Sequence, residues 1–234
     1  MQRETRRLKI FIFDDHDSVR ESYIRWLEFE GYQVVGGEKS LQNCLELLRR
    51  HRPDIVLLDI DYPDDEFAGI RVAKQIASEL PEVKTIFVSH YTDPSIIVQA
   101  FANGASGYFA KADELRYLKE VIEKVSEDHV ALSPTATRRL IEGVRKQPIS
   151  EAAVRRRDFH LTDQETKILG FIAQGLSNKE IARQLHTNEK RIKNVIVALL
   201  AKLDAKNRAH AVAIGITHGL IDVSRIATQG PVEI

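Results

Sequence analysis

The sequence contains very little cysteine, methionine or tryptophan, and it has no long hydrophobic run. Of its 234 residues, one is Cys, one is Met and one is Trp. The single cysteine, Cys44, excludes an intrachain disulfide and any metal site that needs several thiolates. The longest apolar stretches, such as residues 55–58, are too short to cross a bilayer. A signal peptide requires an apolar segment after its charged N-terminus, and the sequence has none there. We therefore expect a cytoplasmic protein with no membrane partner.

The net charge is zero, but the charges are unevenly distributed along the chain. Residues 1–137 carry 17 basic and 24 acidic side chains, residues 138–157 carry 7 and 2, and residues 158–234 carry 10 and 8. An acidic first half followed by a basic remainder is hard to reconcile with one uniform domain. The pattern favours a second domain that binds DNA or another anion. On charge alone, a solvated basic linker without a partner is the alternative.

The first half alternates short apolar runs with segments of helical periodicity. The apolar runs predict five strands, at residues 8–13, 33–36, 55–58, 85–89 and 107–109. The helical segments that follow them are residues 18–30, 41–50, 70–80, 94–102 and 113–126. Strands that are apolar throughout are typical of a parallel sheet covered on both faces. We expect an α/β domain with a doubly wound, five-stranded parallel sheet over residues 1–130, whose ligands bind beyond the carboxyl ends of the strands.

The pattern changes after this domain. Ser133, followed by proline, predicts the N-cap of a helix over residues 134–145. Residues 147–157 then lose periodicity and end in three arginines. We assign residues 131–157 to a linker helix and a flexible basic linker.

The remaining residues, 158–234, show only helical periodicity. Thr162 and Ser177 each begin a capping box, in which a Glu three residues later completes the motif. Asn188 and Asn207 are suitable N-caps for two further helices. We expect an all-α domain of four helices.

Three carboxylates fall at predicted strand ends in the first domain. Asp14 and Asp15 follow the first strand, and Asp59 follows the third. Because parallel strands end at the same edge of a sheet, these acids should converge, and a hard divalent cation would relieve their mutual repulsion. Lys111 and Ser89, at the ends of the fifth and fourth strands, add a positive charge and a hydroxyl at this edge. A carboxylate nucleophile in such surroundings indicates a phosphoryl-transfer site.

The same positions carry motifs that resemble the receiver domain of response regulators. In chain order the motifs are Phe13-Asp14-Asp15-His16, Leu57-Leu58-Asp59, Val88-Ser89 and Gly107-Tyr108-Phe109-Ala110-Lys111. The resemblance extends over roughly residues 8–126. It implies a flavodoxin-like fold for this domain.

The resemblance also implies a role for each residue of the site. Asp59 is the implied phosphoacceptor, with Mg²⁺ as cofactor. Lys111 would contact a phosphoryl oxygen, Ser89 would move its hydroxyl toward the phosphate, and Tyr108 would change rotamer with the switch. The implied metal ligands are the carboxylates of Asp14, Asp15 and Asp59 and the backbone carbonyl of Asp61.

The loop after Asp59 departs from the family pattern. Receivers usually have a proline four residues after the phosphoacceptor and a glycine eight residues after it. Here Pro63 is at the first of these positions, but the glycine, Gly69, comes two residues late, after an acidic stretch over residues 64–68. We expect this longer loop to alter Mg²⁺ affinity or the rate of dephosphorylation while the site is retained.

Residues 161–221 resemble the LuxR-type helix-turn-helix of the NarL/FixJ response regulators, most specifically over residues 172–185. A helix over residues 178–185 leads through a short turn to a second helix, whose first two turns would be presented to the major groove. The residues predicted to contact bases or phosphates are Lys179, Lys190, Arg191, Lys193, Asn194, Val195, Lys202, Lys206 and Arg208. Arg191 and Val195 replace a threonine and a histidine that are common in the family, so the operator sequence cannot be taken from relatives.

The resemblance implies a phosphorylation-controlled, DNA-binding transcriptional regulator, which accepts a phosphoryl group on Asp59 from a sensor histidine kinase. Its enzymatic activity would be limited to phosphoryl acceptance and self-dephosphorylation. The expected partners are the kinase, a second copy of the chain in the active state, and double-stranded DNA with an inverted repeat.

Two alternatives remain at this point. The first is a regulator or interaction protein that works without phosphorylation and uses the first domain to bind a partner. The second is a phosphatase similar to the haloacid dehalogenases, suggested by Asp59-Ile60-Asp61 after an apolar strand. The phosphatase alternative leaves Asp14, Asp15 and the helix-turn-helix unexplained.

Overall fold

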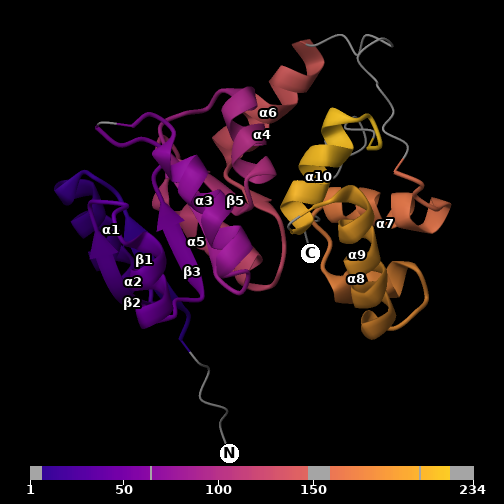
Figure 1. Cartoon of the computed structure of the whole chain (residues 1–234), viewed down its shortest axis with the longest axis horizontal. Helices are drawn as coiled ribbons and strands as arrows, with labels where there is room; N and C mark the ends of the chain where they lie inside the picture. The colour runs from indigo at the N-terminus through magenta and orange to yellow at the C-terminus, as the bar shows by residue number, and fades with distance from the viewer. Residues whose placement is uncertain (1–6, 64, 147–158, 206, 222–234) are drawn as a thin grey trace, which may run out of the picture.

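The computed structural model describes residues 7–63, 65–146, 159–205 and 207–221. Within these ranges the strands are β1 Lys9–Phe13, β2 Gln33–Glu38, β3 Ile55–Leu58, β4 Lys84–Ser89, β5 Ala105–Ala110 and β6 Ala131–Leu132. The helices of the first domain are α1 Asp17–Phe29, α2 Cys44–His51, α3 Ala68–Glu79, α4 Pro94–Ala102, α5 Leu115–Ser126 and α6 Pro134–Lys146. The helices of the second domain are α7 Asp163–Ala173, α8 Asn178–Gln184, α9 Glu189–Leu203 and α10 Arg208–Thr217. The chain therefore forms an α/β unit followed by a helical unit (Figure 1).

The first domain is built on a parallel sheet with the strand order β2-β1-β3-β4-β5-β6. This arrangement confirms the predicted doubly wound parallel sheet, but the number of strands was wrong. The sixth strand, β6, has two residues, which pair with Gly107 and Tyr108 of β5. A two-residue strand is too short to produce a periodic pattern, so nothing in the sequence distinguished it from a turn.

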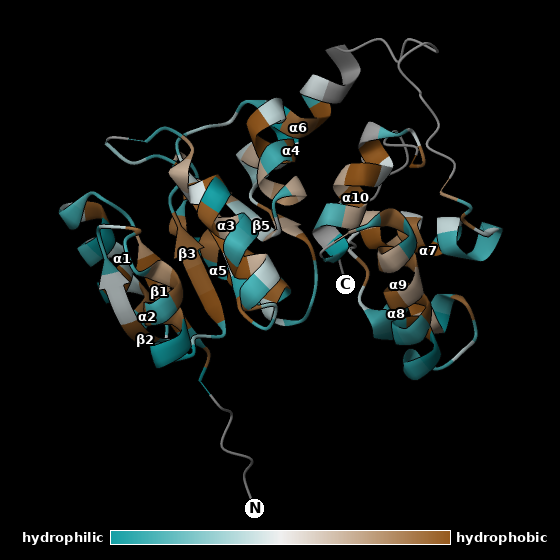
Figure 2. Cartoon of the chain, in the orientation of Figure 1, coloured by the Kyte–Doolittle hydropathy of each residue, from teal (hydrophilic) through white to brown (hydrophobic). Residues whose placement is uncertain are grey.

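The four inner strands β1, β3, β4 and β5 are largely buried because both faces of the sheet are covered, whereas the edge strand β2 is partly exposed. Phe11 and Phe13 of β1 pack on the side of α2, α3 and α4, whereas Ile10 and Ile12 pack on the side of α1 and α5. Successive side chains of a strand point to opposite faces, so each strand contributes to both layers of the core. Figure 2 shows the resulting hydrophobic strands between helices that are hydrophilic on their outer sides.

All four predicted helix starts of the second domain are confirmed. The N-caps are Thr162, Ser177, Asn188 and Asn207, and each side-chain oxygen accepts a hydrogen bond from a backbone N–H in the first turn. Thr162 and Ser177 form complete capping boxes with the glutamates three residues later. Each N-cap contributes about 1 kcal/mol to helix stability, which explains why these short helices begin where they do.

Helix α10 lies between the two domains (Figure 1), where it packs against α4 and β5 as well as against α7 and α9. The side-chain amide of Asn207 donates a hydrogen bond of 2.7 Å to the carbonyl of Gly104. Helix α6 also packs on α4, and a Cβ at Gly143 would collide with the ring of Pro94. The predicted flexible linker, residues 147–157, lies outside the described residues.

The part of the chain that the structure describes contains no helix long and apolar enough to span a membrane.

Candidate functional sites

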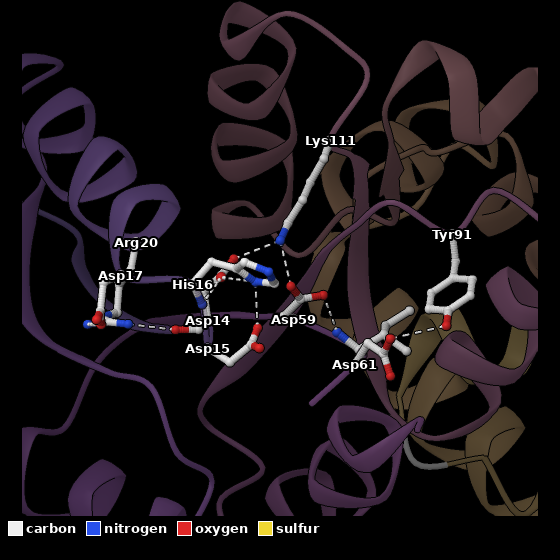
Figure 3. A network of polar contacts seen from close by, with 10 residues as sticks. Asp14, Asp15, His16, Asp17, Arg20, Asp59, Asp61, Tyr91 and Lys111 are labelled. Carbon is white, nitrogen blue, oxygen red and sulfur yellow. Dashed lines mark hydrogen bonds and ion pairs between the residues drawn. The ribbon is translucent and has the colours of Figure 1, made fainter. Parts of the chain in front are cut away.

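The acidic residues predicted to converge do so. Phe13 of β1 is in register with Leu58 of β3, so Asp14 and Asp59 leave the sheet side by side. One carboxylate oxygen from each of Asp14, Asp15 and Asp59 and a ring nitrogen of His16 lie within 4.8 Å of one another. Asp14 and Asp59 are buried, and Figure 3 shows all of these side chains at one edge of the sheet.

Lys111 compensates part of this negative charge. Its Nζ lies 2.8 Å from Asp14 Oδ2 and 2.5 Å from Asp59 Oδ2 (Figure 3), and its side chain is 5% exposed. Burial alone would lower the pKa of Lys111, but the carboxylates of Asp59 and Asp14 outweigh burial and raise this pKa. Lys111 is therefore a cation held between two acids.

The same cluster fits a divalent metal ion. Burial raises the pKa of the Asp59 carboxyl despite the opposing effect of Lys111, and the charge of Asp14 raises it further. The cluster contains the three carboxylates of Asp14, Asp15 and Asp59 against the one ammonium group of Lys111, which therefore does not neutralise it. Several carboxylate oxygens close together and partly open to a pocket are a donor set that suits Mg²⁺, which also retains water ligands.

Ser89 and Tyr108, the two predicted switch residues, meet at the backbone of Tyr91. The Oγ of Ser89 accepts a hydrogen bond of 3.1 Å from the Tyr91 N–H, and the hydroxyl of Tyr108 donates one of 2.8 Å to the Tyr91 carbonyl. Ser89 and Tyr108 are both buried. Burial raises the pKa of Tyr108, so its hydroxyl stays protonated and remains a donor.

Gly69, which comes two residues later than the glycine of the family pattern, has a structural reason for its position. A Cβ at Gly69 would collide with the backbone oxygen of Asp59, and the Gly69 N–H donates a 3.0 Å hydrogen bond to the carbonyl of Ile60. Only glycine allows α3 to begin this close to Asp59. The two additional residues are therefore accommodated before Gly69, in the loop between β3 and α3.

A pocket of about 590 Å³ opens beside Asp59. Besides residues that the sequence identified, its lining includes His16, Glu66, His90 and Tyr91, which the sequence analysis did not select as site residues. His16 belonged to a quoted motif, and its position directly after two acids was a signal. The other three lie in loops, where no periodicity fixes the direction of a side chain.

In the second domain, α9 exposes a polar and basic face. Lys190, Arg191, Lys193 and Asn194 are exposed, while Ile192, Ile196, Leu199 and Leu203 are buried. Val195, predicted as a base contact, is only partly exposed and packs against the core of the domain. Val197 is 61% exposed and lies three to four residues beyond Asn194 and Lys193, so it shares their face of the helix. The sequence analysis did not include Val197 among the predicted contacts.

The other predicted contacts differ in their surroundings. Lys179 is exposed in the first turn of α8. The Nζ of Lys202 donates hydrogen bonds to Glu165 Oε2 at 2.8 Å and to the His160 carbonyl at 3.1 Å. The guanidinium of Arg208 donates to the Leu176 carbonyl and to the side chain of Asn178. Lys206 lies outside the described residues. The predicted DNA contacts of these residues stay predictions.

The two units are of the kind found in signalling proteins that couple a phosphoryl-accepting domain to a DNA-binding one. Residues 10–123 match the response regulator receiver domain, and residues 160–214 match the bacterial regulatory proteins of the luxR family. The transcriptional regulatory protein DegU of Brevibacillus brevis is 30% identical over 229 residues, which are 93% of this chain and 96% of that protein. The DNA-binding transcriptional activator DevR/DosR of Mycobacterium tuberculosis is 31% identical over 210 residues, which are 87% of this chain and 92% of that protein.

A solved structure agrees with these relatives. A two-component response regulator of the LuxR family from Aurantimonas sp. SI85-9A1 is 29% identical, with a TM-score of 0.55 over 58% of this chain and 96% of that chain. The chain belongs to the response regulators that carry a LuxR-type DNA-binding domain, and it is a phosphorylation-controlled, DNA-binding transcriptional regulator. The family match places it among transcription regulators and not among phosphatases.

Proposed function

We propose that Asp59 is the residue that carries the phosphoryl group, and that a sensor histidine kinase supplies it. The observation that carries this proposal is the position of the Lys111 ammonium group, 2.5 Å from Asp59 and 2.8 Å from Asp14, beside an open pocket. Asp59 is the acid of this cluster that lies at the end of a central strand and lines the pocket.

In the proposed reaction, an oxygen of Asp59 attacks the phosphorus atom of the donor. The bond between phosphorus and the imidazole nitrogen of the kinase breaks as the new oxygen–phosphorus bond forms. Asp14, Asp15, Asp59 and the backbone carbonyl of Asp61 would hold Mg²⁺, which supplies positive charge for the transferred group. Lys111 holds Asp59 in position and pairs with a phosphoryl oxygen afterwards.

Phosphorylation then changes the charge balance of the buried cluster. The phosphoryl group adds up to about two negative charges and new acceptor oxygens at the strand ends. We infer that Ser89 turns its hydroxyl toward the phosphate and releases its hydrogen bond with Tyr91. Tyr108, bonded to the same residue, changes rotamer in response, and the α4–β5 surface that contacts α10 is altered.

We further propose that α9 binds in the major groove. The contacts would come from its exposed residues Lys190, Arg191, Lys193, Asn194 and Val197, with Lys179, Lys202, Lys206 and Arg208 near the phosphates and Val195 positioning the helix. Two copies bound to paired half-sites would recognise an inverted repeat.

The test is labelling with a small phosphodonor, acetyl phosphate, in the presence of Mg²⁺. Wild type should acquire label that is lost in Asp59→Asn and retained in Asp128→Asn, a matched change at an exposed acid far from the pocket. Label retained in Asp59→Asn would contradict the proposed acceptor.

A mobility-shift experiment with genomic fragments tests the link to DNA. Phosphodonor should increase the affinity of wild type but not of Asp59→Asn. Equal affinity with and without phosphodonor would instead favour a regulator that acts without phosphorylation.

A further inference from the structure

Val197 is an apolar side chain on an otherwise polar surface. In the part of the chain that the structure describes, the large apolar side chains that are exposed are Phe29, at 87%, and Val197, at 61%. Phe29 ends α1 in the receiver, whereas Val197 lies in the third turn of α9. A single apolar residue on a protein surface is common and needs no partner. Val197 differs from Phe29 because it lies on the helix that we propose to enter the major groove.

The exposed face of α9 changes character along the helix. Its first two turns carry the exposed basic and amide groups, which end with Lys193 and Asn194. Residues three and four apart share a face of a helix, so Val197 follows these two side chains directly. Beyond Asn194 the next exposed residues are Val197, Ala198 and Ala201. A helix that binds along the groove through this face therefore presents polar groups first and methyl groups afterwards.

The chemistry of the major groove leaves one match for Val197. Each base pair presents hydrogen-bonding groups there, and thymine adds a 5-methyl group. The side chain of Val197 has no donor or acceptor, so against the polar edge of another base it would remove water without replacing the lost hydrogen bond. Against a methyl group it buries apolar surface on both sides. Thymine is therefore the base that Val197 is suited to contact.

The spacing along α9 places this contact relative to the polar ones. An α-helix rises 1.5 Å per residue, so Val197 lies about 6 Å beyond Lys193 along the helix axis. Successive base pairs are about 3.4 Å apart. A helix that follows the groove therefore brings Val197 to a base pair about two steps away from the one that Lys193 reaches.

We propose that Val197 is a specificity-determining residue, which contacts the 5-methyl group of a thymine in each half-site. The inference rests on the proposed placement of α9 in the major groove and deepens it by naming a base. Basic side chains attract the phosphates of any sequence, whereas an apolar contact distinguishes a base that carries a methyl group from one that does not. Val197 thus adds selectivity to a face whose charge supplies affinity.

The experiment compares two forms of one duplex, a genomic fragment that the full-length protein binds, prepared with either thymine or uracil at every thymine position. Uracil keeps the hydrogen-bonding groups of thymine and lacks only the methyl group. We expect wild type to bind the uracil duplex about fourfold more weakly per half-site, the factor that corresponds to burial of one methyl group. In Val197→Ala the two affinities should agree within about twofold. Val197→Ile keeps methyl groups at this position and should retain the difference.

Two controls separate this contact from general effects. Phe29→Ala removes the other large exposed apolar side chain and should leave the thymine preference unchanged. Lys193→Ala should weaken binding to both duplexes and preserve their ratio. Equal binding of the two duplexes by wild type, or a preference that persists in Val197→Ala, would overturn the inference, while weaker binding by Lys193→Ala would still support α9 in the groove. Unchanged binding by both Lys193→Ala and Val197→Ala would overturn the proposed placement of α9 itself.

Discussion

Lysines in the two domains lie in opposite environments. Lys111 is buried and paired with two acids of its own domain, whereas Lys190 and Lys193 are exposed on the face of α9. A buried ion pair is poorly screened by salt, and its loss leaves uncompensated charge inside the protein. Exposed lysines contribute little to stability and are available to a ligand. The same type of side chain therefore stabilises a buried cluster in one domain and is available to a ligand in the other.

The largest effect on stability is expected for Lys111→Met. It leaves Asp14 and Asp59 buried without their cation, and we expect the free energy of unfolding of the receiver domain to fall by about 3 kcal/mol. Trp26, the only tryptophan, is in α1 of this domain, so its fluorescence during urea unfolding, with chelator present, reports the receiver alone. Lys74→Met, at an exposed position of α3, should change this free energy by less than about 0.5 kcal/mol. Equal effects of Lys111→Met and Lys74→Met would show that the pairing of Lys111 with Asp14 and Asp59 does not stabilise the receiver domain.

The next effect concerns DNA affinity. Lys193→Ala should weaken binding on the order of tenfold at low salt and should reduce the slope of log affinity against log salt by about one, because one phosphate contact is lost. Mobility shifts at several salt concentrations measure both quantities. The exposed Lys74 of the receiver provides the control, and Lys74→Ala should leave affinity and slope unchanged. An unaltered slope for Lys193→Ala would show that this lysine does not contact a phosphate.

The environment of Lys202 is intermediate between that of the buried Lys111 and that of the exposed Lys193, because Lys202 is partly exposed and pairs with Glu165. Its hydrogen bond lowers the pKa of Glu165, so this pair stabilises the fold above pH 4.5, the ordinary value for Glu, and the contribution is lost as the pH falls through the lowered pKa. We expect Lys202→Met to reduce the stability of the helical domain by about 1 kcal/mol at neutral pH and by less in acid. Circular dichroism follows the unfolding of both domains, and Trp26 fluorescence follows the unfolding of the receiver. We therefore expect the stability change in Lys202→Met to be seen by circular dichroism and not by Trp26 fluorescence. A loss that is independent of pH would contradict this assignment.

The smallest effect is expected at His129, near the junction of the domains. Burial lowers its pKa from 6.5, although Glu180, 3.9 Å from Nε2, partly opposes this, while Arg208 lowers it further. The folded protein therefore binds this proton less well than the unfolded chain, and its stability should fall as the pH decreases below 6.5. Melting temperatures between pH 7.5 and 5.5 should decrease less in His129→Gln than in wild type. The same decrease in both proteins would exclude His129 as the cause.

The sequence predicted those features that depend on local signals. The four N-caps of the second domain were correct because a cap is decided by one side chain and the backbone next to it. The convergence of Asp14 and Asp59 was predictable because parallel strands end at one edge. In contrast, the two-residue strand β6 has no periodicity, and its pairing depends entirely on β5.

Features that depend on the three-dimensional path of a loop or on the rotation of a helix were missed. The contacts of Tyr91 with Asp61 and Phe67 depend on the path of the lengthened loop, which no sequence pattern specifies. Val195 and Val197 are chemically the same, and only the rotation of α9 about its axis makes the second the more exposed. The apolar positions Ile192, Ile196 and Leu199 define that rotation, so a helical-wheel analysis of α9 was the signal that could have identified Val197.

The side-chain amide of Asn207 makes two hydrogen bonds that have different roles. Its oxygen caps α10, and its nitrogen bonds to the carbonyl of Gly104 in the receiver. Chimeric regulators made by exchanging receivers will therefore need more than a compatible linker length. An incoming receiver must present a free carbonyl at the position of Gly104, or the N-cap residue of α10 loses one of these two side-chain hydrogen bonds. Engineering of hybrid sensors from this scaffold should treat the turn between α4 and β5 as part of the exchanged boundary.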